Sequence, residues 1–539
     1  MSRKKPAVTA AEPAAISLPA PPAFGIPQRL ALPIAVGFIL IAILRIVSTY
    51  HVFASTSDEP AHIACGLEYV ANHTYKLETQ HPPLARAFVA LLPYLSGTRP
   101  RGKTSFQLEG WDLITYEHHP DDTMTRMRLG VLPFFVLACL VTFFWARRYF
   151  GDTAAVIATA IFTLIPTVLA HAGLATTDMA LTACLAFAFY MVLRWAEQPT
   201  MARAAIAGFS CGLAILSKFT ALGFLPAALV LAFIAWFAAK RPEMAAMIAL
   251  AKERAAGVAI LAVAACVTIW AAYFFSWHEF FDGINVALKH NHNGHPAWLL
   301  GQERDTGWWY YFPVALAVKT PLGLLALTAI GLYFVVTRFR ARAPYLMPLA
   351  FALGILLPAM QGNVNIGVRH VMPIYIAFSI LAAIACVELS RTPIIPAVLV
   401  LWIAVSGAFA HPDYIPYFNE AARLLGPRDY VLVDSDYDWG QDTKRLATRL
   451  RALGVHDLNW GWVDSPDNQF LETYPGLPHI TNVHPLHPAT GWTAIRPTLE
   501  RIAQYGLQYR YPNLQPWYMY LTPRETVGTI WLYYVPPEK

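Results

Sequence analysis

The stretch LALPIAVGFILIAILRI, residues 30–46, decides the fold class, because it is apolar along its whole length apart from Arg45. Similar apolar runs recur at 132–145, 204–216, 258–275 and 396–410. Helices of this length and composition are typical of spans that cross about 30 Å of hydrocarbon. The sequence therefore predicts a polytopic α-helical membrane protein.

The overall composition agrees with this fold class. Of 539 residues, 56% are hydrophobic and only 14% are charged, which is unusual for a soluble globular protein. The net charge of +6 does not require an anionic partner such as nucleic acid, because lysines and arginines at the cytoplasmic ends of spans give the same excess. Five of the six cysteines fall in or near apolar runs and Cys65 lies in a loop, so the sequence predicts no disulfide framework.

Hydropathy and the positions of basic residues predict a topology of about eleven spans. The basic clusters, among them Arg147 with Arg148 and Lys240 with Arg241, fall on the cytoplasmic side if the tail SRKK at residues 2–5 lies inside. An odd number of spans puts loops 49–126 and 278–312 and the carboxyl segment on the opposite side. The predicted spans are 29–48, 127–147, 153–171, 174–194, 203–217, 219–238, 256–277, 313–337, 344–360, 371–389 and 393–410.

Three regions follow from this topology. Residues 1–28, rich in Ala and Pro, are expected to form a disordered cytoplasmic tail. Residues 29–410 are expected to form the transmembrane domain. Residues 411–539 form a small soluble α/β domain, with strands expected at 430–434, 517–521 and 529–535 and an amphipathic helix at 442–453.

Ionisable side chains collect at the predicted outer ends of the spans. Asp58, Glu59 and His62 follow the first span in STSDEPAH, and His81 follows in TQHPPLARAF. A carboxylate at the membrane edge can take the proton of an acceptor hydroxyl while its oxygen attacks an anomeric carbon. The alternative is that Ser57 or Asp58 caps the helix that Pro60 begins, and capping and catalysis are compatible.

Further charges lie on the same side. Lys218 interrupts an apolar hairpin and Lys319 lies about two turns into a predicted span, so each ammonium group requires a lipid phosphate or a carboxylate, unless Lys319 extends to the interface. Asp178 lies near the outer end of the fourth span. Arg369 and His370 lie at the outer mouth of the tenth, where both suit a phosphate or serve only as interfacial anchors.

Two other clusters have weaker interpretations. The stretch KHNHNGH brings together His290, His292 and His295, so a divalent metal is conceivable, although alternate residues of a loop do not make a coordination shell. The run VLVDSDYDWGQD lacks the calcium-loop pattern. Asx turns and a helix cap explain its acids more simply. The sequence therefore predicts no certain cofactor.

The chain resembles the GT-C superfamily of membrane glycosyltransferases, specifically the bacterial dolichyl-phosphate-mannose protein mannosyltransferase-like group related to lipid A aminoarabinose transferases. The resemblance covers most of residues 30–450. It is carried by SDEPAHIACGLEY, HPPLARA, HAGLATTDMALT, GLAILSKFTAL, VKTPLGLL, GVRHVMPIY, and the stretch from PDYIPYFNE to DSDYDWGQDTKRL.

The resemblance implies a polyprenyl-phosphate-linked sugar as donor, transfer on the periplasmic face of the bacterial inner membrane, and an essential acid in the first outer loop. The resemblance assigns the role of essential acid to Asp58 as first choice and to Glu59 as second choice. The family's second acid corresponds to Asp178, and its donor-phosphate positions correspond to Lys218, Arg369 and His370. His81 stands where aminoarabinose transferases have lysine, which puts phosphate contact there in doubt.

We therefore predict a hexosyl- or pentosyltransferase that acts by inverting single displacement on an unknown acceptor (glycan, lipid or protein). A protein acceptor is not implied, because the lumenal domain of eukaryotic protein mannosyltransferases is not recognisable. One alternative is a transporter or flippase for a lipid-linked saccharide, which would carry polar groups near the midplane and often paired repeats. A polysaccharide polymerase or ligase and a non-catalytic scaffold are the others.

Overall fold

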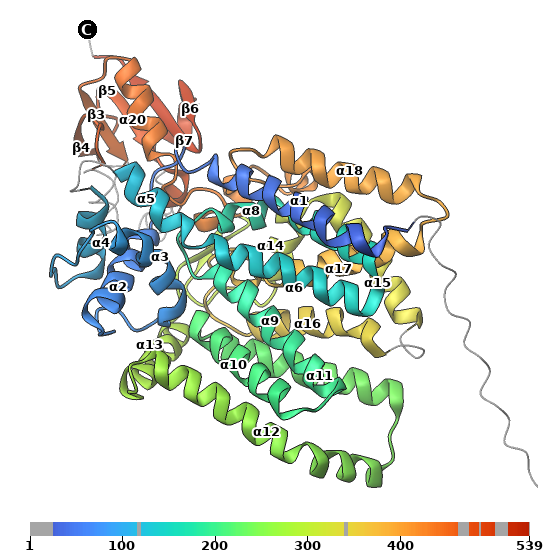
Figure 1. Ribbon diagram of the computed structural model, residues 1–539. Helices are drawn as coiled ribbons and strands as arrows, with labels where there is room; N and C mark the ends of the chain where they lie inside the picture. Colours follow the sequence, from blue (N-terminus) through green and yellow to red (C-terminus); the bar gives the residue numbers. More distant parts are fainter. Residues whose placement is uncertain are drawn as a thin grey trace, which may run out of the picture.

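The computed structural model describes residues 25–115, 120–338, 343–461, 474–483, 487–501 and 516–537. The predicted tail at 1–28 lies mostly outside these ranges, and the first helix begins at Gln28. The order of elements is predominantly helical up to residue 409 and mixed thereafter (Figure 1).

The apolar helices form one bundle. By length and composition, five helices among the described residues are apolar enough to cross a membrane, or up to seven if each bent pair counts as one span, whereas the sequence predicts about eleven. Several shorter apolar helices complete the bundle. The helices are α1 (Gln28–Val47), α6 (Leu132–Phe150), α7 (Asp152–Phe162), α8 (Pro166–Ala172), α9 (Asp178–Glu197), α10 (Met201–Ser217), α11 (Ala221–Lys240), α12 (Met244–Ala272), α14 (Tyr311–Lys319), α15 (Leu322–Arg338), α16 (Met347–Ala359), α17 (Ile374–Glu388) and α18 (Ile394–Phe409).

Two predicted spans are broken rather than continuous. The span 153–171 is the pair α7 and α8, which meet at 69°, and the span 313–337 is the pair α14 and α15, which meet at 115°. Ile165 and Thr320 are extended at the breaks, and each precedes a proline, Pro166 or Pro321. A residue before proline is disfavoured in the helical region, so the helix ends there.

The two predicted outer loops are themselves helical. The first contains α2 (Glu59–Asn72), α3 (Pro83–Leu95), α4 (Phe106–Thr115) and α5 (Pro120–Leu129), and the second contains α13 (His278–Asn293) and a hairpin of β1 (Ala297–Leu299) and β2 (Gln302–Arg304). Figure 1 shows these helices gathered at one end of the bundle, on the side of the carboxyl-terminal sheet. The outer loops therefore form a cap over one end of the apolar helices.

The carboxyl-terminal sheet has five strands in the order β4-β3-β5-β7-β6. The strands β3 (Asp457–Gly461), β4 (His479–Val483) and β5 (Gly491–Ile495) are parallel, while β7 (Ile530–Val535) runs antiparallel to β5 and to β6 (Glu525–Val527). Helix α20 (Thr443–Ala452) packs Leu446 and Leu450 against this sheet. Trp111 of α4 belongs to the same apolar core, so the sheet is anchored to the cap.

Two predicted strands in this region are wrong. Residues 430–434 are not a strand, because α19 (Arg428–Val431) begins there after Pro427 and is followed by the 3₁₀ turn η4 (Asp434–Asp436). Residues 517–521 are also largely a 3₁₀ turn, η6 (Trp517–Tyr520), which follows Pro516. Proline directly before a turn of helix has the φ that helical starts require. The expected helix at 442–453 and strand at 529–535 correspond to α20 and β7.

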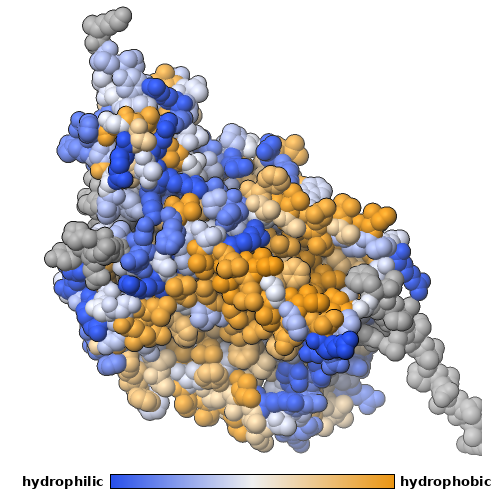
Figure 2. Space-filling view, turned by 45° about the horizontal axis from the view of Figure 1, so that its top comes forward, coloured by the Kyte–Doolittle hydropathy of each residue, from blue (hydrophilic) through white to orange (hydrophobic). Residues whose placement is uncertain are grey.

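The surface separates by polarity along the bundle. Figure 2 shows apolar side chains in a broad belt over the helices, with polar side chains around the cap and the sheet and again at the opposite end. Outward-facing residues of the belt include Leu44, Val230, Val263 and Leu401, all more than half exposed. Such a contiguous apolar surface is costly in water. It marks the face that lies in lipid.

Candidate functional site

Four charged side chains from separate parts of the chain form one series of ion pairs where the bundle meets the cap. Arg369 donates from Nη1 to Asp58 at 2.7 Å, and the same nitrogen lies 3.6 Å from Asp178. Lys218 donates to the other oxygen of Asp178 at 2.7 Å. Two carboxylates and two cations therefore alternate in one small region.

Each of these residues lies at the end or break of a helix. Asp58 is the N-cap of α2 and Asp178 is the first residue of α9. Lys218 ends α10 in extended conformation, just before α11. Arg369 lies in the 3₁₀ turn η2 (Val368–Val371), which follows Gly367 at φ +107°. Chain breaks allow charged groups to point across the end of the bundle instead of into lipid.

The side chains of Asp58 and Asp178 differ in their exposure to solvent. The Asp58 side chain is 38% exposed, whereas that of Asp178 is fully buried. Burial alone would raise the pKa of Asp58, but the charge and hydrogen bond of Arg369 hold it below its ordinary value. Asp58 is therefore an ionised carboxylate that a substrate can reach.

Arg369 is held by an aromatic face as well as by carboxylates. Its guanidinium lies 4.1 Å from the centre of the Trp439 ring, and its Nε donates to the carbonyl of Ile366 at 3.3 Å. Cation–π contact of this kind suits arginine better than lysine. Trp439 belongs to the DWGQD stretch, so the carboxyl-terminal segment forms part of the site.

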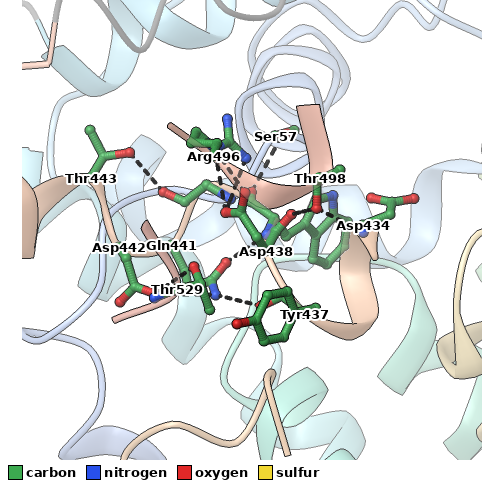
Figure 3. A network of polar contacts seen from close by, with 12 residues as sticks. Ser57, Asp434, Tyr437, Asp438, Gln441, Asp442, Thr443, Arg496, Thr498 and Thr529 are labelled. Carbon is green, nitrogen blue, oxygen red and sulfur yellow. Dashed lines mark hydrogen bonds and ion pairs between the residues drawn. The ribbon is translucent and has the colours of Figure 1, made fainter. Parts of the chain in front are cut away.

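The same stretch pairs with the chain just before Asp58. The amide of Ser57 donates to the carbonyl of Trp439 at 3.1 Å, and the amide of Ala54 donates to that of Gln441 at 2.9 Å. Figure 3 shows this run with Ser57 on one side and the Asp438–Arg496 pair beside it. The position of Asp58 thus depends on residues nearly four hundred positions later.

A second polar group lies beside Asp58 and is built on α2 and α3. His62, one turn after Asp58, is buried and accepts from Arg86 Nε through Nδ1 at 3.2 Å. The rings of His62 and His81 are 5.6 Å apart, and Arg86 also pairs with Glu78. Burial, with the charge of Arg86, lowers the pKa of both imidazoles, so both are neutral at pH 7.

His370 also faces the ion pairs. It lies within electrostatic reach of Lys218, Arg369 and Asp178, and burial together with the two cations holds its pKa well below the ordinary value. A neutral imidazole offers one N–H to a ligand oxygen. His62, His81 and His370 are therefore hydrogen-bonding groups without charge.

Glu59, adjacent to Asp58, points into the protein. It is fully buried, pairs with Arg128 at 2.8 and 2.9 Å, and accepts from the amides of Thr56 and Ala175 at 2.8 and 2.9 Å. Every direction around this carboxylate is occupied by the protein. Its geometry is that of a structural anchor, in contrast to the catalytic role that the sequence suggests as second choice.

Lys319 likewise has protein partners in place of a ligand. The 115° break puts it at the end of α14 rather than two turns inside a span, where its ammonium donates to the carbonyls of Ile415 and Asp436 at 2.7 and 2.6 Å. It also lies 4.4 Å from the centre of the Phe418 ring. These contacts fasten the carboxyl-terminal segment to the bundle.

The histidine-rich loop does not gather a ligand set. Among the described residues, no group of three or more His, Cys, Asp or Glu side chains could hold a metal ion. His290 and His295 lie with ring centres 5.7 Å apart, and Nδ1 of His295 contacts the carbonyl of Pro296.

Three residues near the ion pairs are not predicted from sequence. Trp439 supports Arg369, and His171 lies edge-on to Trp439 with its Nδ1 unpaired among the described residues. Asp434 lies within electrostatic reach of Arg369 and Asp58. The run VLVDSDYDWGQD (431–442) was the available signal for the first and third, but its acids suit turns and caps equally well.

Comparison with known proteins agrees with this architecture. The family model for dolichyl-phosphate-mannose-protein mannosyltransferase matches residues 36–278. ArnT from Cupriavidus metallidurans, in a crystal structure bound to undecaprenyl phosphate, is 15% identical, with 92% of this chain and 97% of that chain covered and a TM-score of 0.50. The apo structure of the same ArnT is 16% identical, with 93% and 98% covered and a TM-score of 0.50.

A third solved structure, the oligosaccharyltransferase of Archaeoglobus fulgidus tethered with an acceptor peptide, is 14% identical, with 83% of this chain and 60% of that chain covered and a TM-score of 0.45. A comparison with curated proteins finds no match. The match over residues 36–278 and the fold shared with ArnT confirm the resemblance of this chain to the GT-C membrane glycosyltransferases.

Proposed function

We propose that this protein transfers a sugar from a polyprenyl-phosphate donor to an acceptor hydroxyl on the non-cytoplasmic side of the bacterial plasma membrane. The observation that carries the proposal is the series Asp58, Arg369, Asp178 and Lys218 at one end of an apolar bundle. It supplies a reachable carboxylate and two cations at the membrane edge. A lipid-linked phosphate donor requires this combination.

The reaction is a single displacement. Asp58 takes the proton of the acceptor hydroxyl while that oxygen attacks the anomeric carbon, and the bond from this carbon to the phosphate oxygen breaks. The bonding pair leaves with the polyprenyl phosphate, whose charge Arg369 and Lys218 neutralise. Attack opposite the leaving group inverts the anomeric carbon. Asp178 keeps both cations in position.

Donor binding and base strength are coupled in this arrangement. Arg369 pairs with Asp58 and lowers its pKa. A phosphate that binds Arg369 competes for this guanidinium, so the pKa of Asp58 rises and the carboxylate becomes a better base. The neutral imidazoles of His62, His81 and His370 donate hydrogen bonds to phosphate or sugar oxygens, without requiring a further charge.

The side of the membrane follows from the distribution of basic residues. Arg147 and Arg148 end α6 and Lys240 ends α11, whereas Lys218 lies just before the start of α11, at the opposite end of that helix. Basic residues concentrate on the cytoplasmic side. This distribution supports a periplasmic position for the ion pairs and the carboxyl-terminal sheet.

The test uses purified protein and a panel of polyprenyl-phosphate hexoses and pentoses, with sugar release or transfer as readout. Asp58→Asn keeps the shape of the side chain but cannot accept the proton, so we expect turnover to fall at least 100-fold. Glu59→Gln is expected to reduce thermal stability, because it leaves Arg128 buried without a charge partner.

The matched control is Asp413→Asn, an acid with 44% of its side chain exposed that also pairs with an arginine, Arg445. It should retain wild-type turnover. Wild-type turnover in Asp58→Asn would refute the assigned base. Absence of stabilisation by undecaprenyl phosphate in the wild-type protein would refute the lipid-phosphate donor.

A further inference from the structure

Asp434 has a constrained backbone, four residues before the DWGQD stretch (438–442). Its φ is +58°, a left-handed conformation that glycine adopts readily and Asn or Asp only occasionally. The amide donates to Oγ of Thr498 at 2.9 Å, and the carbonyl accepts from the amide of Tyr437 at 2.9 Å. The flanking Val433 and Ser435 are buried. The surroundings therefore fix the direction of this side chain.

The residue after Asp434 contacts the turn that carries Arg369. Ser435 donates from Oγ to the carbonyl of Ile366 at 2.7 Å, and the same carbonyl accepts from Arg369 Nε at 3.3 Å. Arg369, His295, Asp58 and Asp436 are the charged or titratable groups that act on the carboxyl group of Asp434. Figure 3 shows its carboxylate pointing away from the Asp438–Arg496 pair. Among the described residues, no hydrogen bond to this carboxylate is present, although it is only partly exposed. In the part of the chain that the structure describes, Asp434 is thus a carboxylate near Arg369 without a hydrogen-bond donor, in contrast to Asp58, to which Arg369 donates.

The chemistry of the site limits what Asp434 can bind. An ionised carboxylate only accepts hydrogen bonds, so it repels the donor phosphate and attracts hydroxyl groups. Asp58 and Asp434 both act on Arg369. A molecule with neighbouring hydroxyls can therefore present one to Asp58 and another to Asp434.

We propose that Asp434 is an acceptor-binding residue that selects a hydroxyl-rich acceptor, the sugar part of a glycan or glycolipid. This proposal rests on the transferase function proposed above. In it, the carboxyl-terminal segment supplies acceptor specificity, while the bundle supplies donor binding and the base. Burial and the neighbouring acids raise the pKa of Asp434 to about 6, so it is mostly ionised at pH 7.

The test compares Asp434→Asn and Asp434→Gly with wild type. Both residues tolerate a left-handed backbone, so both variants should fold and melt at a temperature close to or above that of wild type. Binding of a methyl glycoside panel, in the presence of undecaprenyl phosphate, is followed by saturation-transfer NMR. We expect at least tenfold weaker binding in both variants, with stabilisation by undecaprenyl phosphate changed less than twofold.

The outcomes separate this proposal from the general function. Equal glycoside binding by Asp434→Asn and wild type would overturn it, as would the absence of glycoside binding by wild type. Parallel loss of stabilisation by undecaprenyl phosphate would overturn it too, since Asp434 would then act on the donor side. Glycoside binding that depends on Asp434, without turnover of any donor, would count against the transferase function alone. Asp413→Asn again serves as the control.

Discussion

At the scale of single residues, Glu303 is a carboxyl group outside the ion pairs whose pKa is changed by burial. It lies in β2 opposite Trp298 and is 9% exposed. Burial and the neighbouring Asp305 raise its pKa to about 7. Because the folded state holds this proton more tightly than the unfolded state, the associated stability is present at low pH and is lost as pH rises from about 4.5 to 7.

Glu303→Gln removes this pH dependence. The variant should match wild type near pH 4.5 and be more stable at pH 8, by at most about 3 kcal/mol. Thermal unfolding in detergent across this range checks the prediction. Glu525→Gln, which changes a partly exposed acid paired with Arg449, is the control and should follow the wild-type curve. If the stability of wild type and of Glu303→Gln depends on pH in the same way, the raised pKa of Glu303 is contradicted.

The same scale shows what sequence could and could not predict about the site. Asp58 and Glu59 are adjacent acids in one motif, and the sequence predicts Asp58 as the first and Glu59 as the second candidate for the catalytic base. Successive residues of a helix point about 100° apart, so one carboxylate faces Arg369 and the other faces Arg128. Which of the two carboxylates faces inward depends on contacts with α5 and with the segment between α8 and α9. Both elements are far from the motif in sequence, so the motif alone does not predict these contacts.

At the scale of elements, close helix packing depends on glycines. A Cβ at Gly331 of α15 would lie 2.0 Å from the carbonyl oxygen of Leu381 in α17, whereas Gly37 of α1 has no atom within 4 Å of such a Cβ. Small residues allow helices in membranes to approach closely. Gly331 is therefore the test position for an alanine substitution, and Gly37 is its control.

Gly331→Ala should reduce stability by about 1–3 kcal/mol, because α15 and α17 must separate. Gly37→Ala should be neutral or slightly stabilising, since alanine is the better helix former. Thermal unfolding of both variants in the same detergent measures the difference. Equal melting temperatures for the two variants would mean that the contact between α15 and α17 relaxes at no cost.

Element boundaries show where hydropathy succeeds and fails. The predicted spans at 29–48, 203–217 and 371–389 correspond closely to α1, α10 and α17, because long apolar runs can satisfy their backbone only as helices. The breaks at 163–165 and 320–321 lie inside apolar runs and do not change hydropathy. The wrong strand at 430–434 has the apolar, β-branched pattern of a strand, but Pro427 begins a turn of helix there.

At the scale of the whole molecule, the candidate site is assembled from parts of the chain that are far apart in sequence. The first outer loop supplies Asp58, the bundle supplies Asp178, Lys218 and Arg369, and the carboxyl-terminal segment supplies Trp439. The sheet contributes no side chain to the ion pairs. One link between the sheet and these pairs is Asp438, which precedes Trp439 and pairs with Arg496 after β5.

This arrangement predicts that a residue remote from the reacting groups controls activity. Arg496→Met leaves Asp438 buried without its cation, which should cost about 3–5 kcal/mol. Trp439 would then lose its fixed position under Arg369, so turnover should fall at least tenfold, and limited proteolysis should cut the carboxyl-terminal region faster. Arg449→Gln, which removes the partly exposed pair with Glu525, should change stability by less than about 1 kcal/mol.

A double variant separates the lost charge balance from the lost contact. Asp438→Asn combined with Arg496→Met removes both buried charges, so most of the stability lost in Arg496→Met should return. Turnover should recover less than stability, because the fork of hydrogen bonds from Arg496 that orients the 438–441 turn is still absent. If turnover and stability recover together, the pair acts only by holding the sheet in place. If Arg496→Met alone keeps wild-type turnover and protease resistance, the sheet does not position Trp439, and the centre depends on the bundle and cap alone.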